Sequence, residues 1–348
     1  MISGQRINTS KSFFTVDRKT PNLRIQCIQQ VTGFHLKFLP ITYLGAPLFK
    51  GNKKGVLFDG IVQKIKSRIT SWEKALLSHG GRLQLIKSVL SAMPLYLIQV
   101  LKPPKFVIER IERLFNKFFW GSFGEQKKIH WTSWDSACFP TEEGGLGVRR
   151  IDDMSEAFQY KAWWRFRNQS SLWAQFTLDK YCKGSHPLIA PLPHFASPNW
   201  KRLWRLRKEA DRHCFWSLGE GKISFWFDNW VGEKPLGEQV SEHPWSFASV
   251  SFFWTDNKWD YLKLSQALPL NLVQQISNIP FDPTCADSIY WKLSTNGTFS
   301  TKSIWGQIRQ TKSSQHLLRE IWCPYIPPTM SVFLWRLINN NIPVDTRL

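Results

Sequence analysis

The chain has 348 residues, room for about two domains, and 43% of them are hydrophobic, which is enough to bury a core. This composition excludes a chain that is disordered throughout. The formal net charge of +20 favours polyanionic partners.

The first 50 residues mix short apolar runs with Gly and Pro, a composition that predicts strands and turns. Within this stretch, residues 38–40 followed by 43–48 predict a hairpin, or an edge strand ended by proline.

From residue 56 apolar residues recur every three or four positions, which predicts three amphipathic helices. The first has its apolar face at Phe58, Ile61, Ile65, Ile69, Trp72 and Leu76. The second opens at residues 78–82, turns Leu83, Ile86 and Leu90 inward and stops at Met93-Pro94. The third follows Pro103-Pro104 and carries Val107, Ile111, Leu114 and Phe118 on one side.

The outer faces of these helices are basic. Residues 1–170 hold 27 Lys and Arg against 12 Asp and Glu, a net +15, while residues 171–348 hold 19 against 14, a net +5. This asymmetry predicts RNA, an RNA–DNA hybrid or DNA as the partner; the alternative is a solvated basic surface. The candidate nucleic-acid-binding residues are Lys64, Arg68, Arg82, Lys87, Arg110, Arg113 and Lys117.

Further along, a Gly-rich loop at 144–147 precedes a predicted helix from about 152 to 169. Residues 184–199 contain four prolines and predict a linker. Alternation over residues 222–227, behind Gly219 and Gly221, predicts a small hairpin. Two helices are expected in the last 50 residues, near 300–310 and near 328–339.

Several blocks carry a family resemblance by their order. They are Ser3-Gly4-Gln5, Leu39-Pro40 with Tyr43-Leu44-Gly45, Gly80-Gly81-Arg82, Met93-Pro94, Phe119-Trp120, Gly144-Gly145-Leu146-Gly147, Phe225-Trp226 with Asp228 and Trp230, Gly297 with Phe299-Ser300, and Phe333-Leu334-Trp335-Arg336. This order resembles the C-terminal half of plant LINE-type (non-LTR retrotransposon) reverse transcriptases. Ser155, where the family usually has Asn, is a departure.

The resemblance implies an α+β protein that is mostly α. It implies a palm remnant (1–50), a helical thumb-like domain (51–183), a Trp-rich connector with a short hairpin (195–290) and a truncated reverse-transcriptase zinc-binding region (291–348). The family's catalytic aspartates are expected before residue 1, and its zinc ligands after Leu348. No catalytic residue and no cofactor is therefore expected in this chain, although the parent enzyme would use Mg²⁺ and Zn²⁺.

The implied function is a fragment of an RNA-directed DNA polymerase that grips template–primer and is inactive alone. One alternative is a free-standing nucleic-acid-binding or interaction protein derived from a retroelement, whose protein partners the sequence leaves unknown. Another is a ribonuclease H-type nuclease, a domain that in this family lies beyond the zinc region.

Other candidate sites have a simpler interpretation. Asp152-Asp153 is the one adjacent pair of aspartates, and it is expected to open a helix, where acids favour the free N–H groups. Cys182 with His186, and His213 with Cys214, lack a second pair at zinc-site spacing. The turn at 80–82 is either a plain corner or a corner that also contacts phosphate. Most tryptophans are expected in the core.

Six scattered cysteines without CxxC spacing predict a reduced, intracellular protein, nuclear or cytoplasmic. The apolar stretches are too short to span a bilayer, so no membrane association is expected.

Overall fold

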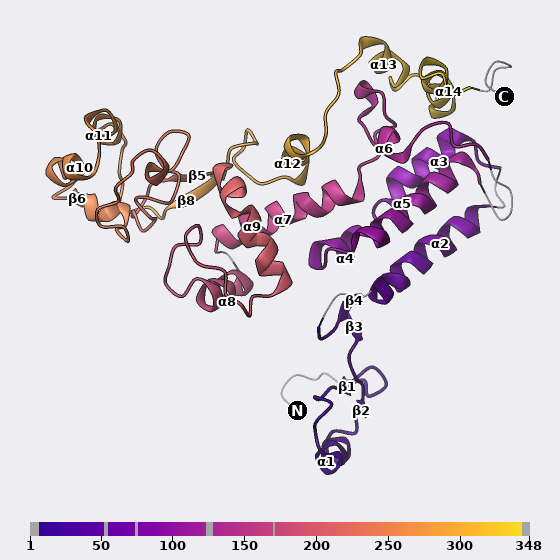
Figure 1. Ribbon diagram of the computed structural model, residues 1–348, viewed down its shortest axis with the longest axis horizontal. Helices are drawn as coiled ribbons and strands as arrows, with labels where there is room; N and C mark the ends of the chain where they lie inside the picture. Colours follow the sequence, from indigo (N-terminus) through magenta and orange to yellow (C-terminus); the bar gives the residue numbers. More distant parts are fainter. Residues whose placement is uncertain (1–6, 52–54, 74–75, 123–127, 170, 343–348) are drawn as a thin grey trace. The chain divides into compact units, whose positions relative to one another are not determined.

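A computed structural model describes residues 7–51, 55–73, 76–122, 128–169 and 171–342 (Figure 1). The chain divides into two compact units, of which unit 1 is residues 1–151 with 311–348 and unit 2 is residues 152–310. Helices dominate both units and the sheets are small, so the prediction of a mostly α-helical α+β protein is confirmed.

Unit 1 begins with short strands. Its elements before residue 50 are β1 (Phe13–Phe14), α1 (Asn22–Thr32), β2 (His35–Leu36), β3 (Ile41–Tyr43) and β4 (Ala46–Leu48). Strands β1 and β2 pair in parallel, and β3 and β4 form an antiparallel hairpin in which Tyr43 lies opposite Ala46. The predicted hairpin is confirmed, whereas helix α1 was not expected.

The helical part of unit 1 follows. Its elements are α2 (Asp59–Glu73), α3 (His79–Leu85), a π-turn (Ile86–Leu90), α4 (Leu95–Val100), α5 (Lys105–Trp120), α6 (Trp134–Ala137), α13 (His316–Ile321) and α14 (Pro328–Ile338). Figure 1 shows α2, α3 and α5 side by side, and α14 packs on α3. The three predicted helices form, but α2 ends at Glu73 and leaves Leu76 fully exposed.

Gly80 is required where α14 crosses α3. A Cβ built on Gly80 would lie 2.5 Å from the backbone nitrogen of Thr329, closer than real contacts allow. Ser78 caps α3 by accepting a hydrogen bond of 3.2 Å from the Gly81 N–H, and its Oγ lies 3.1 Å from Thr329 Oγ1. These contacts favour the plain corner over a phosphate contact at residues 80–82.

Unit 2 begins in the first turn of α7. Its elements are α7 (Ile151–Arg167, whose first residue belongs to unit 1), α8 (Leu172–Tyr181), α9 (Pro198–Arg212), β5 (Cys214–Ser217), β6 (Trp254–Thr255), β7 (Lys258–Trp259), α10 (Tyr261–Ala267), α11 (Leu270–Ser277), β8 (Ser288–Trp291) and α12 (Thr301–Ile308). The predicted helices near 152–169, 300–310 and 328–339 are confirmed as α7, α12 and α14.

Aromatic side chains build the core of unit 2. The rings of Tyr181 and Trp200 stack 5.0 Å apart, and Phe225 stacks on Phe253. The fully buried tryptophans of the chain include Trp163, Trp200, Trp226, Trp230, Trp291 and Trp335. Core packing, the role expected of most tryptophans, is confirmed for these residues.

The hairpin expected at 222–227 does not form. This segment makes a single antiparallel bridge, from Ser224 to Ser249, and Phe225 and Trp226 are both buried instead of alternating. The short hairpin of this region is β6–β7, where Trp254 lies opposite Trp259. The four-segment division of the chain stays a prediction, because it assigns segments by resemblance and the two units group residues by contact.

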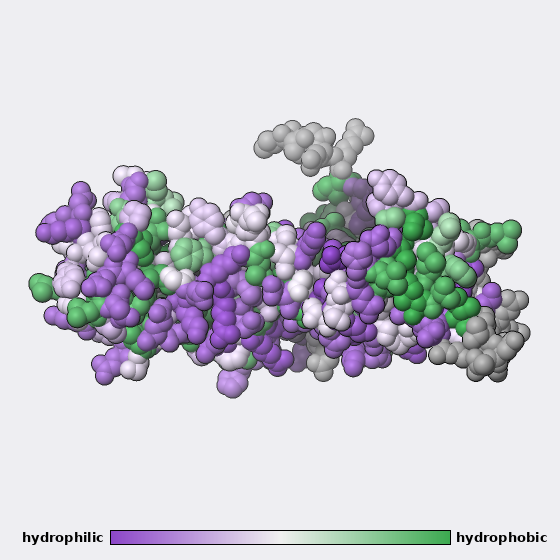
Figure 2. All heavy atoms as spheres, turned by 90° about the horizontal axis from the view of Figure 1, so that it is seen from above, coloured by the Kyte–Doolittle hydropathy of each residue, from purple (hydrophilic) through white to green (hydrophobic). Residues whose placement is uncertain are grey.

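Figure 2 shows that hydrophilic and hydrophobic side chains both occupy the face that it displays. On α14, Met330, Phe333 and Leu337 are each more than half exposed. None of the helices among the described residues is long and apolar enough to cross a bilayer.

Candidate nucleic-acid interface

Helices α2 and α5 pack through their apolar sides. Ile65 and Ile69 of α2, and Ile111 and Phe118 of α5, are buried. The rings of Trp72 and Phe118 lie 5.9 Å apart near the ends of the two helices. Because the apolar sides face the core, the polar sides of both helices are left to solvent.

Five of the seven candidate nucleic-acid-binding residues are exposed on these helices. They are Lys64 and Arg68 of α2, and Arg110, Arg113 and Lys117 of α5. Arg110 has an intramolecular partner, since its Nη1 lies 2.9 Å from Asp59 Oδ1. Both side chains of this ion pair are 46% exposed, so the pair contributes little to stability.

Helical geometry separates the exposed cations of α2. Each residue advances about 100° around a helix, so Arg68 lies on the opposite side of α2 from Asp59. Lys64 lies about 140° from Asp59, and Lys66 lies within about 20° of it. Asp59 contacts Arg110 of α5. Exposed Lys66 is therefore the α2 cation on the α5 side, and Lys64 and Arg68 are not.

We call Lys66, Arg110, Arg113 and Lys117 the α5 basic face. The sequence prediction missed Lys66. Lys66 follows Asp59 by seven residues and so lies on the same side of α2, but only the structure shows that this side faces α5. On α5 itself, Arg110, Arg113 and Lys117 have the three- and four-residue spacing that places side chains on one side of a helix.

Nearby acids are partly engaged. Glu112 Oε1 accepts a hydrogen bond of 3.1 Å from the Ile151 N–H, and Glu109 lies 3.9 Å from Lys105. Arg113 Nε donates to the Glu109 carbonyl at 3.2 Å, which orients its guanidinium. Lys117 adds to the effect of burial in lowering the pKa of His130.

Arg82 and Lys87 lie elsewhere and are half-buried. The guanidinium of Arg82 packs on Gly121, the left-handed residue that ends α5, where a Cβ would clash with it. Lys87 Nζ lies 5.5 Å from the centre of the Trp322 ring. Burial lowers the pKa of both side chains. The structure thus gives these two cations contacts inside unit 1 and does not bring them to the α5 basic face.

Asp152 and Asp153 lie in the first turn of α7, as expected of a helix start. In the described part of the chain, no group of three or more His, Cys, Asp and Glu side chains is arranged to hold a metal ion. Of the isolated candidate ligands, Cys182 and Cys214 are buried, and burial raises the pKa of Cys182 to about 11.

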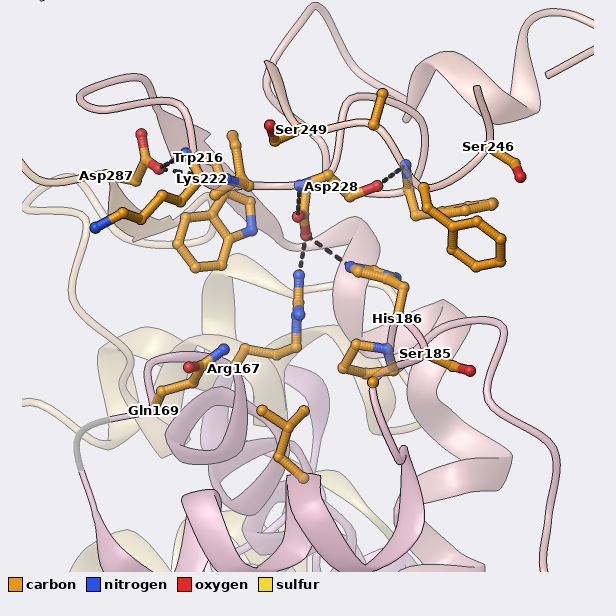
Figure 3. A pocket seen from close by; sticks show the side chains of 18 of the residues that line it. Arg167, Gln169, Ser185, His186, Trp216, Lys222, Asp228, Ser246, Ser249 and Asp287 are labelled. Carbon is orange, nitrogen blue, oxygen red and sulfur yellow. Dashed lines mark hydrogen bonds and ion pairs between the residues drawn. The ribbon is translucent and has the colours of Figure 1, made fainter. Parts of the chain in front are cut away.

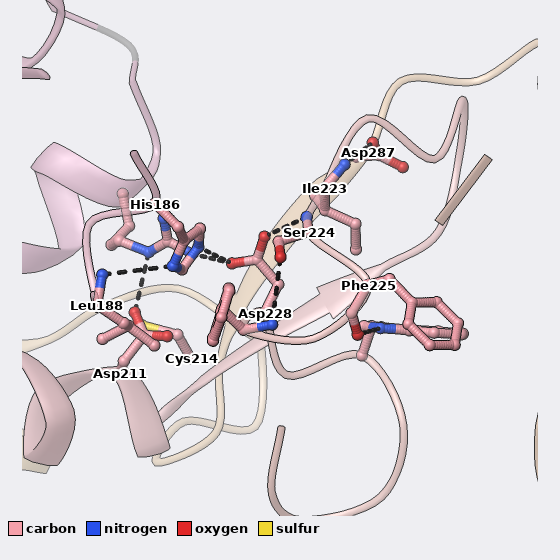
Figure 4. Close-up of polar contacts among 12 residues, drawn as sticks. His186, Leu188, Asp211, Cys214, Ile223, Ser224, Phe225, Asp228 and Asp287 are labelled. Atoms are coloured by element: carbon pink, nitrogen blue, oxygen red, sulfur yellow. Dashed lines mark hydrogen bonds and ion pairs between the residues drawn. The ribbon is translucent and has the colours of Figure 1, made fainter. Parts of the chain in front are cut away.

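Unit 2 contains a buried charged network that the sequence did not reveal. Arg167 at the end of α7 contacts Asp211 of α9 at 2.9 Å and also pairs with Asp228 (Figure 3). Figure 4 shows His186 beside the same aspartate, Asp228. His186 Nε2 lies 3.1 Å from Asp228 Oδ1, and the Trp163 indole N–H donates to Asp211 at 3.0 Å. Arg167, His186 and Asp228 line a pocket of about 490 Å³ (Figure 3).

The network is compensated internally. Burial would raise the pKa of Asp228, but Arg167, His186 and the Ser224 N–H together hold it well below its usual range. Burial raises the pKa of Asp211, because Arg167 offsets only part of the lost hydration. Each charge has an opposite charge beside it, which is the arrangement of a structural ion-pair network.

A second carboxylate organises the neighbouring loop. Asp287 Oδ1 accepts the N–H groups of Gly219 at 2.7 Å and Gly221 at 2.9 Å, and Oδ2 accepts those of Lys222 at 2.7 Å and Ile223 at 3.3 Å. Two of these N–H groups, those of Lys222 and Ile223, are then not available to a hairpin ladder at 222–227. The rest of the segment bonds elsewhere, since the Phe225 N–H donates to the Ala248 carbonyl and the Ile223 carbonyl accepts from the Val250 N–H.

Comparison with known proteins gives three matches. Residues 299–348 match the family described as zinc-binding in reverse transcriptase. A protein of Arabidopsis thaliana named as a ribonuclease H protein is 30% identical over 309 residues, covering 83% of this chain and 49% of the relative. An uncharacterized mitochondrial protein of the same plant is 25% identical over 149 residues, covering 42% of this chain and 97% of the relative.

The donor set of the matched zinc-binding stretch does not complete a zinc site. Residues 299–348 contain one histidine, His316, and one cysteine, Cys323. A structural zinc site needs four such ligands. His316 and Cys323 by themselves therefore do not make a structural zinc site.

The chain spans about half the length of the ribonuclease H-named relative. The zinc-binding match lies where the order of sequence blocks places it, and both relatives come from a plant. Together these matches support a reverse-transcriptase region of the retrotransposon type.

Proposed function

We propose that this chain grips the sugar–phosphate backbone of a template–primer duplex, with the α5 basic face as a principal contact. The observation that carries the proposal is the set of four exposed cations on two packed helices, Lys66, Arg110, Arg113 and Lys117. Proteins that hold a duplex without reading its sequence do so mainly through Lys and Arg contacts to phosphate.

The distribution of charge supports a polyanionic partner for unit 1. Its residues include 28 Lys and Arg against 11 Asp and Glu, a net charge of +17, whereas unit 2 has 18 against 15, a net +3. A field of this size raises the rate at which a polyanion encounters the surface. Grip is therefore assigned to unit 1, and the partner is RNA, an RNA–DNA hybrid or DNA.

The helices that carry the face are firmly anchored. On α5, Ile111, Phe115 and Phe118 are each about 1% exposed, so the backbone beneath the cations is fixed by packing. A rigid platform lowers the entropy lost when a partner binds. The α5 basic face has the properties of a pre-organised contact surface.

We further propose that the chain does not itself polymerise. A polymerase holds two divalent ions about 4 Å apart with carboxylates. The one adjacent pair of aspartates, Asp152-Asp153, opens helix α7, and the adjacent glutamates Glu142-Glu143 lie in a short 3-10 turn. Primer extension on an RNA template with Mg²⁺ or Mn²⁺ is expected to give no product, and template-dependent synthesis by the pure chain would refute this part of the proposal.

The grip is tested by replacing Lys66, Arg113 and Lys117 with Gln, which leaves the Arg110–Asp59 ion pair intact. Fluorescence anisotropy with a mixed-sequence RNA–DNA hybrid is measured over a salt series. We expect weaker binding to all sequences alike. The slope of log affinity against log salt is expected to flatten by about 2–3, since each neutralised phosphate contributes about 0.7–0.9.

A matched control removes the same charge elsewhere in unit 1, by replacing the exposed residues Arg18, Lys19 and Arg24 with Gln. The control is expected to keep most of the salt slope. A double change of Lys64 and Arg68 to Gln tests the other side of α2, where the sequence also placed contacts. Equal slopes for the α5 variant and the wild type would show that the α5 basic face is only solvated surface.

A further inference from the structure

Helix α9 of unit 2 carries a line of cations that the sequence analysis did not single out. Lys201, Arg205, Lys208 and Arg212 are spaced by four, three and four residues. At about 100° per residue, all four lie within about 60° of one another around the helix, along about 16 Å of its axis. We call these four residues the α9 stripe.

The opposite side of α9 is buried. Trp200 and Leu203 are 2% and 3% exposed, and Ala210 is fully buried. At the N-terminus, Ser197 caps the helix by accepting a hydrogen bond of 3.2 Å from the Trp200 N–H. The stripe therefore has a fixed backbone beneath it and faces away from the core.

Three other charged residues of the helix, Asp211, Arg207 and Arg202, make their contacts outside the stripe. Asp211 turns inward to Arg167 at 2.9 Å, which removes a negative charge from the surface of α9. Arg207 donates to the Leu188 carbonyl at 2.9 Å and lies over the Trp204 ring at 3.7 Å. Arg202 hydrogen bonds to Asn199.

Within the stripe, Arg212 pairs with Glu209 at 3.1 Å. Lys201, Arg205 and Lys208 have no ion-pair partner among the residues that the structure describes. Glu238 is a further acid nearby, since it lines a cavity of about 160 Å³ with Lys208.

This concentration of charge is unfavourable within the free protein. Like charges three or four residues apart destabilise a helix by about 0.2–0.5 kcal/mol per pair. The rest of unit 2 does not share the excess, because the net charge of the unit is only +3. A row of unpaired cations on a nearly neutral unit is a local feature, distinct from the broad positive field of unit 1.

We infer that the α9 stripe is a second nucleic-acid contact, which binds backbone phosphates of a single or double strand independently of the α5 basic face. The stripe is complementary in charge to a linear polyanion. Along one side of the helix it presents three cations without an ion pair and one exposed cation that pairs with Glu209. The inference does not rest on the proposed grip of unit 1, because a different unit and different side chains carry it.

The test uses the full chain with Lys201, Arg205 and Lys208 replaced by Gln. Binding to a mixed-sequence RNA–DNA hybrid and to single-stranded RNA is measured over a salt series. We expect an affinity loss of about tenfold or more at low salt and a salt slope flatter by about 2–3. A control with exposed Lys183, Lys234 and Lys258 changed to Gln removes the same charge from unit 2 and is expected to leave the slope within about 0.5 of wild type.

A charge-preserving variant, Lys201→Arg with Arg205→Lys and Lys208→Arg, is expected to retain binding, and circular dichroism checks that every variant is folded. An α9 variant that binds like the control would overturn the inference while leaving the unit 1 grip intact. If the α9 variant lost affinity and the α5 variant did not, the inference for α9 would stand and the proposed grip of unit 1 would be refuted. Tighter binding to phosphatidylserine vesicles than to RNA at equal phosphate would also overturn it, by assigning the stripe to a membrane.

Discussion

The two units use charged residues in opposite ways. Unit 1 has a net charge of +17 and keeps cations such as Arg113 and Lys117 at the surface. Unit 2 has a net charge of +3 and places Arg167, Asp211 and Asp228 in its interior. Surface charges can change with little effect on folding, whereas a buried charge needs an opposite charge beside it. Removing a charge should therefore affect binding in unit 1 and stability in unit 2, with the α9 stripe as the proposed exception.

The largest effect is expected from Arg167→Met, which leaves Asp211 and Asp228 buried without their shared cation. Breaking a buried ion pair by removing one partner costs about 3–5 kcal/mol. Hydrogen exchange of peptides from unit 2 should show the loss of protection. Arg165→Met, at an exposed position of the same helix, is the control. Equal protection in the two variants would break the contrast between the units.

The next effect concerns Asp287→Asn, which keeps the shape of the side chain but loses an acceptor oxygen and the charge. Four backbone N–H groups depend on this carboxylate. Because hydrogen bonds to charged groups contribute about 1.5–3 kcal/mol and do not add fully, we expect a loss of roughly 2–4 kcal/mol. Urea unfolding measures this loss, and exposed Glu242→Gln is the control. An unchanged urea midpoint would show that the loop at 219–223 is stable without the Asp287 carboxylate.

In unit 1 the sharpest pH dependence is expected from His79. Burial first, and then the charges of Arg336, Arg82 and Lys128, lower its pKa from 6.5 to about 4. The neutral ring, which packs 5.7 Å from Phe119, is favoured in the folded state. The unfolded state therefore binds more protons, and this stabilisation is complete above pH 6.5 and is lost as the pH falls toward about 4.

Thermal unfolding between pH 4 and pH 7 tests this dependence on the wild type and on His79→Gln. The variant should have a flatter profile over that range, whereas His316→Gln, at an exposed site, should keep the wild-type profile. Parallel profiles for the wild type and His79→Gln would assign the acid sensitivity to other groups.

The smallest effect is expected at the start of α7. Asp152→Ala and Asp153→Ala should each lower the free energy of unfolding by roughly 0.5–2 kcal/mol, as the loss of helix-terminal acids does. Melting curves measure this. If either change left melting unaltered and abolished a metal-dependent activity, the assignment of the pair as a helix start would be wrong.

Periodic signals in the sequence were sufficient for the long helices. Helix α5 follows from Pro104 before it, Gly121 after it and apolar residues every three or four positions, all within 18 residues of chain. Its exposed cations follow from the same periodicity, since a buried side defines an outer side. The overall fold class, the corner at Gly80 as one of two alternatives, and the burial of tryptophans such as Trp163 and Trp335 were accessible for similar reasons.

Tertiary structure decided every feature that joins distant residues. Lys66 shares a face with Arg113 because Asp59 meets Arg110, 51 residues away. The segment 222–227 alternates like a strand, yet Asp287 takes two of the N–H groups that a hairpin would use. Local sequence contains the propensity of each segment but not the identity of the partner that competes for its backbone.

The same division holds for the charges. Composition alone determined that the chain is basic, that most of the excess lies before residue 171, and that a polyanion suits it. Which cations stay free was decided only by folding. Arg167 forms buried ion pairs with two aspartates, Arg82 packs on Gly121, and Lys208 stays at the surface of α9. The reason is that burial and pairing depend on contacts across the folded chain, whereas charge is a property of each residue by itself.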